Sequence, residues 1–415
     1  MPSPSPSRSR SPLPPASFPL SLICHCHTLD LTLPISRSSL PLPAPICHCT
    51  RCRTHFSSLF STWLHLPTQL SPPHPALDKL VQYPFTPRTK LYACPTCGAT
   101  CFLDFGAGWL VGSGVVDWGL LRGAVAEETG EGKTRAEVSM EGAKKREWKD
   151  VLMRRGGEYC ALEHTGDGGA AVWMSGIEKR EAGQDLRLVP DGFGEEMMAS
   201  TRGKLEELRI RGDWDGRVRF GCGCGKVVAY VMRGERGAEE QRNVESRKFR
   251  AVLVGDVDER RCSGFEVGAW MEVQWRNVRC DGELGRFLEE VKMGQVGDSG
   301  VTIRAQESKD ASSCRLKLYR SAPGTERYSC SGCGARVFVM ERKRPGWLKI
   351  GAGLLKSEMG ARAEDWLDWS IDVPDEDAED RGEEELVEDL KKGMDIWSKG
   401  LKEGLARIDS INDIL

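Results

Sequence analysis

Apolar and polar residues alternate over many short segments of this chain, a pattern that predicts β-strands. The segment KVVAYVM, from Lys226 to Met232, is one example, and Gly and Pro residues separate such segments. Near the C-terminus the spacing becomes helical, with apolar residues at Leu386, Leu390, Met394, Trp397, Leu401, Leu405 and Ile408. We therefore expect a mainly β protein with a C-terminal amphipathic helix whose apolar face packs on its own domain rather than on a partner.

A gapless internal repeat organises the chain. Residues 80–102 (LVQYPFTPRTKLYACPTCGATCF) align with residues 316–338 (LKLYRSAPGTERYSCSGCGARVF). The match resumes with GWLVGSGVV from Gly108 and GWLKIGAGLL from Gly346, and a Cys-x-Cys on a short apolar strand precedes each copy (LICHC and FGCGC). One ancestral unit therefore occurs twice.

The repeat and the composition between its copies set the expected domains. We expect a disordered Pro/Ser/Arg-rich tail at 1–19 and a first zinc-binding β module at 20–116. A charged linker or insertion with a Gly-rich segment follows at 117–214, and the second β module lies at 215–370. An acidic stretch and the helix complete the chain at 371–415.

Composition and charge narrow the class of protein. A chain of 415 residues with 40% hydrophobic residues can bury two modest cores. A net charge of -3 offers no basic surface for nucleic acid, and no apolar run is long enough to cross a bilayer. The 16 cysteines are too sparse for a secreted disulfide scaffold, and most stand in tight pairs that favour metal binding. We expect a reducing compartment, the cytoplasm, with the nucleus as the alternative.

The cysteines of the first copy fall into three groups. They are Cys24/Cys26, Cys47/Cys49/Cys52 and Cys94/Cys97, more than one tetrahedral zinc site needs. The second copy keeps the outer pairs, as Cys222/Cys224 and Cys330/Cys333, and lacks the middle triplet. A closed four-cysteine site built from the outer pairs is therefore complete in both copies, and such a site is structural.

The triplet Cys47, Cys49 and Cys52 is left as an open site. Three thiolates bind zinc tetrahedrally and leave one position for an incoming ligand. The alternative is that His48 or His55 closes the site as a second structural zinc. Three thiolates make zinc a poor Lewis acid, so delivery of a bound thiolate fits this site better than activation of water.

The order Cys-x-Cys, Cys-x-Cys-x-x-Cys-Arg, a tyrosine-led strand with Cys-x-x-Cys-Gly, and then Gly-Trp-Leu resembles the glutathione-dependent formaldehyde-activating enzyme family, which includes centromere protein V. The arrangement is similar to the tandem two-domain forms found in fungi. The resemblance covers about residues 20–116 and 217–369. It implies a β-tent fold for each module, a structural zinc on the outer pairs, and a catalytic zinc on the triplet where a glutathione thiol binds.

The family's activity gives the leading functional hypothesis. It implies a zinc-dependent carbon–sulfur lyase acting on glutathione–aldehyde adducts such as S-(hydroxymethyl)glutathione. Arg51 and Arg53 flank the triplet, where they would either clamp glutathione carboxylates or be ordinary solvated charges. The partner would be a small thiol–aldehyde adduct. A non-catalytic zinc module for protein or chromatin contacts, and a family member kept for its fold alone, are the alternatives. The sequence leaves the oligomeric state open.

Both copies depart from the family pattern. The first has CRTHFSS where the family has a glycine shortly after the triplet. In the second, SGFEVGAW matches the downstream stretch, and counting back places Val254, Asp256 and Glu259 at the three ligand positions. These are not zinc–thiolate ligands, so we expect three zinc ions per chain. The segment EHTGDGGAAVWM (163–174) resembles one in tandem fungal members and is otherwise a Gly-rich turn. No role is assigned to Cys101, Cys160, Cys262, Cys280 and Cys314.

Overall fold

The computed structural model describes residues 17–67, 70, 75–119, 153–154, 159–174, 193–211, 216–233, 248–280, 285, 316–372 and 384–412. Strand β1 begins at Ser17, and the rest of the expected N-terminal tail lies outside these residues, as does most of the expected linker. Within the described part, no helix is long and apolar enough to cross a membrane.

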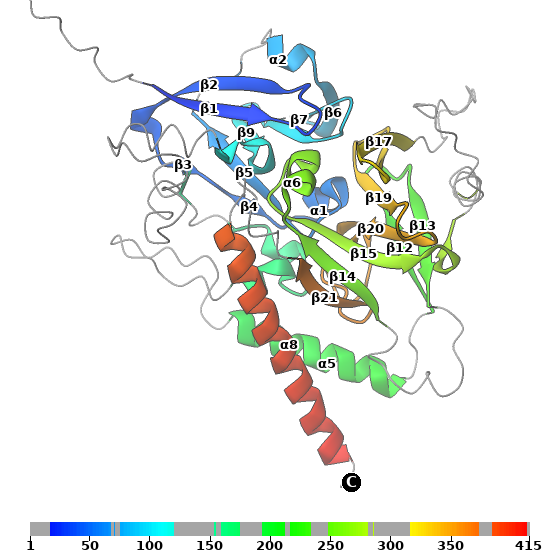
Figure 1. Ribbon diagram of the computed structural model, residues 1–415. Coiled ribbons are helices and arrows are strands. Elements are labelled where there is room, and N and C mark those ends of the chain that lie inside the picture. The colour runs from blue at the N-terminus through cyan, green and yellow to red at the C-terminus, as the bar shows by residue number, and fades with distance from the viewer. Residues whose placement is uncertain are drawn as a thin grey trace, which may run out of the picture.

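The first half of the molecule, which comprises the described residues of 17–174, is built on a seven-stranded sheet of order β11-β4-β5-β9-β8-β7-β6 (Figure 1). Strands β1 and β2 form a separate hairpin, and β10 pairs with β3. The strands are β1 Ser17–Ile23, β2 Asp30–Ser36, β3 Leu42–Pro43, β4 Ile46–Cys47, β5 Ser61–Leu66, β6 Val81–Thr86, β7 Thr89–Ala93, β8 Thr100–Asp104, β9 Trp109–Gly112, β10 Met153–Arg154 and β11 Tyr159–Cys160. The helices are α1 Thr50–Phe56 and α2 Pro75–Asp78, with 3-10 turns η1 Arg37–Ser39, η2 Ser113–Val115, η3 Leu162–His164 and η4 Gly169–Trp173.

The second half, residues 216–372 as described, repeats this architecture. Its seven-stranded sheet has the order β17-β18-β19-β20-β15-β14-β21, and β12, β13 and β16 form a smaller sheet. The strands are β12 Arg217–Gly221, β13 Val228–Met232, β14 Phe249–Val254, β15 Gly268–Gln274, β16 Val278–Arg279, β17 Leu316–Ala322, β18 Thr325–Cys330, β19 Arg336–Glu341, β20 Trp347–Gly351 and β21 Leu367–Asp372, with helix α6 Val257–Ser263 and the turns η7 Trp275–Asn277 and η8 Ala352–Leu354.

The two sheets match strand for strand. The aligned repeats form β6–β8 in one half and β17–β19 in the other. At the opposite edge a parallel strand pairs with the strand that leads into a short helix, β11 with β4 and β21 with β14. The prediction of a mainly β protein is confirmed, and the sequence repeat extends to the topology.

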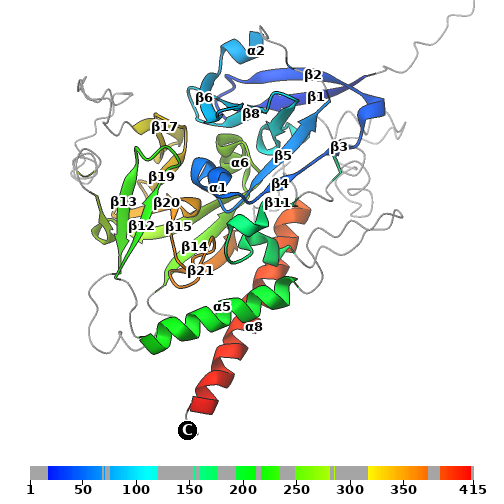
Figure 2. The same cartoon turned by 180° about the vertical axis from the view of Figure 1, so that it is seen from behind.

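The halves pack through reciprocal contacts. Helix α1 of the first half meets η8 of the second, and α6 of the second meets η2 of the first. Backbone hydrogen bonds mark both contacts, from Gly353 N to Ser57 O at 3.3 Å and from Gly114 N to Gly264 O at 2.9 Å. Figures 1 and 2 both draw α1 and α6 close together in the middle of the molecule, between strands of the two large sheets. Each half therefore braces the short helix of the other.

The C-terminal helix α8, Glu384–Asn412, is confirmed and packs on the protein's own core through Leu386, Leu390, Met394 and Trp397. The side chains of Leu405 and Ile408 lie outside the described residues. A second helix, α5 (Phe193–Arg211), crosses α8 (Figure 2).

The Gly-rich segment 163–174 is a packed turn at the base of α8. Gly168 and Gly169 have φ of +79° and +55°, which glycine adopts without strain. The fully buried Arg362 donates to the carbonyls of Asp167 and Gly169, and its guanidinium lies 4.4 Å from the ring centroid of Trp397. One arginine thus joins this segment, the second half and the C-terminal helix.

Candidate metal centres

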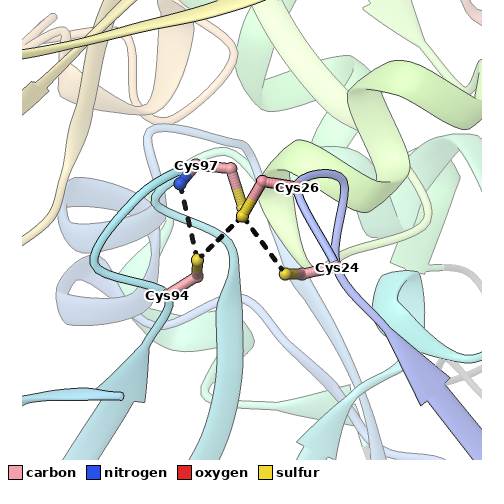
Figure 3. Close-up of side chains that lie close together, drawn as sticks. All are labelled: Cys24, Cys26, Cys94 and Cys97. Atoms are coloured by element: carbon pink, nitrogen blue, oxygen red, sulfur yellow. Dashed lines mark hydrogen bonds between the residues drawn. The ribbon is translucent and has the colours of Figure 1, made fainter. Parts of the chain in front are cut away.

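The first cluster joins the turn after β1 to the turn between β7 and β8. Cys24 and Cys26 lie on one turn and Cys94 and Cys97 on the other, with the four sulfurs directed toward one another (Figure 3). Each sulfur lies within 4.8 Å of the others, and the Cys26 and Cys94 sulfurs are 3.3 Å apart. The amide of Cys97 donates to Cys94 Sγ at 3.4 Å, a bond that stabilises a thiolate there.

The second cluster has the same construction in the other half. Cys222 and Cys224 follow β12, and Cys330 and Cys333 lie between β18 and β19, again with every sulfur within 4.8 Å of the others. The Cys222 and Cys330 sulfurs are 3.8 Å apart, and the amide of Val227 donates to Cys222 Sγ at 3.4 Å. The structure therefore brings together the outer pairs that the repeat analysis grouped.

These distances suit a tetrahedral zinc ion. A Zn–S bond of about 2.3 Å places two sulfurs of a tetrahedral site about 3.8 Å apart. Hydrogen bonds from neighbouring thiols lower the pKa of Cys94 and Cys222, whereas the surrounding sulfurs and burial raise the pKa of Cys97 and Cys333. Four thiolates this close would repel one another unless a cation lay between them, and the spacing of the sulfurs in both clusters fits a closed zinc–thiolate site.

The triplet lies where β4 passes into helix α1. Cys47 ends the strand, Cys49 is the residue before the helix, and Cys52 lies in its first turn. The amide of Cys52 donates to Cys49 Sγ at 3.3 Å, and the Cys52 and Cys47 sulfurs are 3.5 Å apart. Cys52 is buried, whereas Cys47 and Cys49 are partly exposed. The cluster therefore has one buried anchor and two ligands that solvent can reach.

The triplet group contains three sulfurs and, among the described residues, no further ligand atom within the same 4.8 Å limit. His48 and His55, the two candidate fourth ligands, are buried nearby but are not members of the group. Burial, followed by the charge of Arg53, lowers the pKa of His48 to about 3, so that imidazole is neutral. The arrangement fits three thiolates with one open position.

Three thiols this close do not ionise independently. Hydrogen bonds from Cys47 and Cys52 lower the pKa of Cys49 to about 2, and the interaction with Cys49 raises the pKa of Cys47 to about 12. The interactions within the triplet therefore favour a thiolate at Cys49 over thiolates at Cys47 and Cys52. A bound divalent ion would favour ionisation of the other two sulfurs and release their protons.

The two flanking arginines have different surroundings. Arg51 is exposed and donates to the carbonyl of Phe85, so it remains at the surface beside the cluster. Arg53 is buried and donates to Thr50 Oγ1 at 3.4 Å and to the carbonyl of His164 at 3.2 Å. Arg53 therefore anchors helix α1 to the segment after β11, whereas Arg51 is the arginine that faces solvent.

Strand β11, which lies within the expected linker 117–214, contributes a neighbour of the triplet that the sequence did not indicate. Cys160 pairs with Cys47 across parallel strands, and its carbonyl accepts from the amide of His48 at 3.0 Å. No local motif joins these residues, because about a hundred residues separate them in the chain. Cys101 and Cys262 are buried outside the clusters, Cys280 is partly buried, and Cys314 lies outside the described residues.

The three positions of the second half that correspond to the triplet are not cysteines. Val254 ends β14, and Asp256 precedes helix α6 and accepts from the amide of Glu259 at 2.6 Å, as Cys49 does from Cys52. Counting along the sequence thus identified structurally equivalent positions. Burial alone would raise the pKa of Glu259, but the charges of Arg336 and Arg327 outweigh it and hold that pKa at about 2.

Residues 20–130 match the family model described as Glutathione-dependent formaldehyde-activating enzyme. This segment includes the first four-cysteine cluster and the triplet, so the match supports that family for the first half. Neither the curated proteins nor the solved structures contain a match.

Proposed function

We propose that the first half is a zinc-dependent carbon–sulfur lyase centre that acts on glutathione–aldehyde adducts such as S-(hydroxymethyl)glutathione. The observation that carries this proposal is the partly exposed triplet of Cys47, Cys49 and Cys52, three converging sulfurs without a fourth protein ligand among the described residues. It lies in the segment that matches the formaldehyde-activating family. We further propose that the halves are two β-tent modules in tandem, of the fungal two-domain type.

A zinc ion held by the three thiolates would supply an open coordination position for a thiol sulfur. The buried Cys52 anchors the site from below, while Cys47 and Cys49 border the side that substrate can reach. Arg51 at the surface is placed to bind a glutathione carboxylate. In the lyase direction the carbon–sulfur bond breaks, the sulfur keeps the electron pair, and the hydroxyl proton is released as the C=O bond of the aldehyde forms.

The two four-cysteine clusters have a different role in this proposal. All four positions of each are protein ligands, so neither offers a place for substrate. They hold together the turns that connect the strands of each half. The chain would therefore carry three zinc ions, two structural and one at the triplet.

The test is a metal count with a glutathione titration on the purified full-length chain. We expect three zinc ions in the wild-type protein and two in Cys52→Ser. In the wild type alone, X-ray absorption should show that glutathione adds a sulfur ligand to one zinc. Release of formaldehyde from the adduct, followed by NMR, should be lost in Cys52→Ser. The control is Cys280→Ser, which changes a cysteine outside all three clusters.

Two results would contradict the proposal. Four zinc ions per chain would place a metal in the second half's equivalent of the triplet. Three zinc ions whose coordination does not change when glutathione is added would favour the non-catalytic module for protein or chromatin contacts.

A further inference from the structure

We propose that Glu259, Arg327 and Arg336, here called the acid–arginine cluster, take the place of a metal ion in the second half, and that through Arg336 this cluster positions helix α1 and its ligand Cys52. The second part of this inference rests on the proposed function, because it concerns metal binding at the triplet.

The internal repeat provides the first argument. Glu259 occupies the position equivalent to Cys52. In the gapless alignment, Arg327 and Arg336 stand where the first copy has Leu91 and Thr100. The acid and both bases are thus present together in one copy and absent together from the other. Such a joint difference is expected if the three residues form one unit.

In the structure, Glu259, Arg327 and Arg336 form one ion-paired cluster. The Glu259 side chain is 2% exposed, and each of its carboxylate oxygens has its own arginine. Arg327 Nη1 donates to Oε2 at 2.6 Å, and Arg336 Nη1 donates to Oε1. A buried carboxylate without partners would be strongly destabilising, whereas one that is paired on both oxygens is fixed in place. The cluster holds the first turn of α6 as a metal would hold three thiolates.

A hydrogen bond between the halves extends this effect to the triplet. Arg336 Nη2 donates to the carbonyl of Phe56 at 3.2 Å. Phe56 is the last residue of α1, where helix carbonyls lack partners within the helix and favour a cation. The same seven-residue helix carries Cys52 in its first turn. Arg336 therefore links the fixed carboxylate of one half to the ligand-bearing helix of the other.

The experiment measures Co²⁺ affinity of the triplet in full-length protein, by chelator competition and by the thiolate-to-cobalt absorption band. Replacing a residue that orients metal ligands typically lowers metal affinity about 10–100-fold. We expect Arg336→Met to lower the affinity of the triplet roughly 10-fold and to change its absorption band, with the four-cysteine clusters unaffected. Arg336→Lys keeps the charge but not the two-pronged geometry, and should restore part of the affinity.

The matched control is Arg344→Met. Arg344 also pairs with a buried acid, Glu272 at 3.0 Å, and stacks on Trp347, both within the second half. This control should leave the affinity and spectrum of the triplet unchanged, even if it lowers the melting temperature. A positioning role predicts a changed triplet in Arg336→Met and an unchanged one in Arg344→Met, whatever the melting temperatures of the two variants.

The inference is overturned if Arg336→Met binds Co²⁺ at the triplet with the affinity and spectrum of Arg344→Met. Should Arg336→Met fail to fold, Arg336→Lys and Glu259→Gln take its place, and wild-type cobalt binding in both would equally overturn it. A wild-type triplet that binds no cobalt contradicts the proposed function and, with it, the positioning role. Wild-type binding with unchanged variants contradicts this inference alone.

Discussion

Gly353 of the second half packs directly against the C-terminal end of helix α1, so Gly353→Ala tests how the halves support each other. A Cβ at this position would lie 2.2 Å from Ser58 O, 2.6 Å from Arg53 O and 2.7 Å from Ser58 N. Favourable contacts between heavy atoms begin at about 3.5 Å. The added methyl group is therefore too close by roughly 1 Å to three backbone atoms, none of which can rotate away as a side chain would.

Overpacking of a well-packed interior typically costs about 1–3 kcal/mol. Because the obstacle is backbone, we expect Gly353→Ala to lower the free energy of unfolding by about 3 kcal/mol, measured by urea denaturation with zinc present. Displacement of α1 should also weaken Co²⁺ binding at the triplet. Gly114→Ala is the reciprocal variant, with its Cβ 2.3 Å from Phe265 N, and should destabilise the protein without weakening the triplet.

The control for both is Gly216→Ala, where an added Cβ meets no atom within 4 Å and φ is not positive. It should change stability by less than about 0.5 kcal/mol. If Gly353→Ala were as stable as Gly216→Ala, the argument that η8 packs closely on α1 would be refuted. If Gly114→Ala weakened cobalt binding as much as Gly353→Ala, the support of α1 by η8 would not be specific.

Two further predictions concern the structural clusters and the buried acid. Cys97→Ser and Cys333→Ser should each remove one zinc by mass spectrometry and lower the melting temperature sharply, because metal binding in such sites is coupled to folding, and unchanged values in both would refute the structural role. The pKa of Glu259 falls from 4.5 to about 2 on folding, so its carboxylate should contribute about 3 kcal/mol above pH 4.5 and lose this contribution as the pH falls toward 2. Urea unfolding of wild type and Glu259→Gln at each pH tests this, and a difference that did not shrink on acidification would refute it.

Much of the fold and the clusters could be predicted from the sequence because the relevant signals are local or repeated. The alternating pattern specified strands, and the stripe from Leu386 to Trp397 specified the helix that packs on the core. The repeat grouped the outer cysteine pairs because both copies keep them. Counting back from SGFEVGAW reached Asp256 and Glu259, and the structure places both at the positions equivalent to Cys49 and Cys52.

The contacts between the halves could not be predicted in this way. Phe56 and Arg336 lie 280 positions apart, and no pattern along the chain marks their hydrogen bond. Buried arginines present the same difficulty. In the sequence Arg53, Arg260 and Arg362 look like ordinary surface charges, yet they are buried and donate to backbone carbonyls of distant segments. A sequence shows the charge of such a residue but not the carbonyls that make its burial possible.

The reciprocal packing explains why a second half without the triplet still needs a fixed site. Helix α6 supports η2 of the first half, where the buried Arg260 donates to the carbonyls of Gly114 and Val116. A loose α6 would disturb the first half, so loss of the thiolates requires another way to hold the first turn of the helix. A carboxylate paired with two arginines does this and offers no open coordination position. We therefore expect two helices held by different chemistry in one molecule, with reactivity confined to the half that retains the three cysteines.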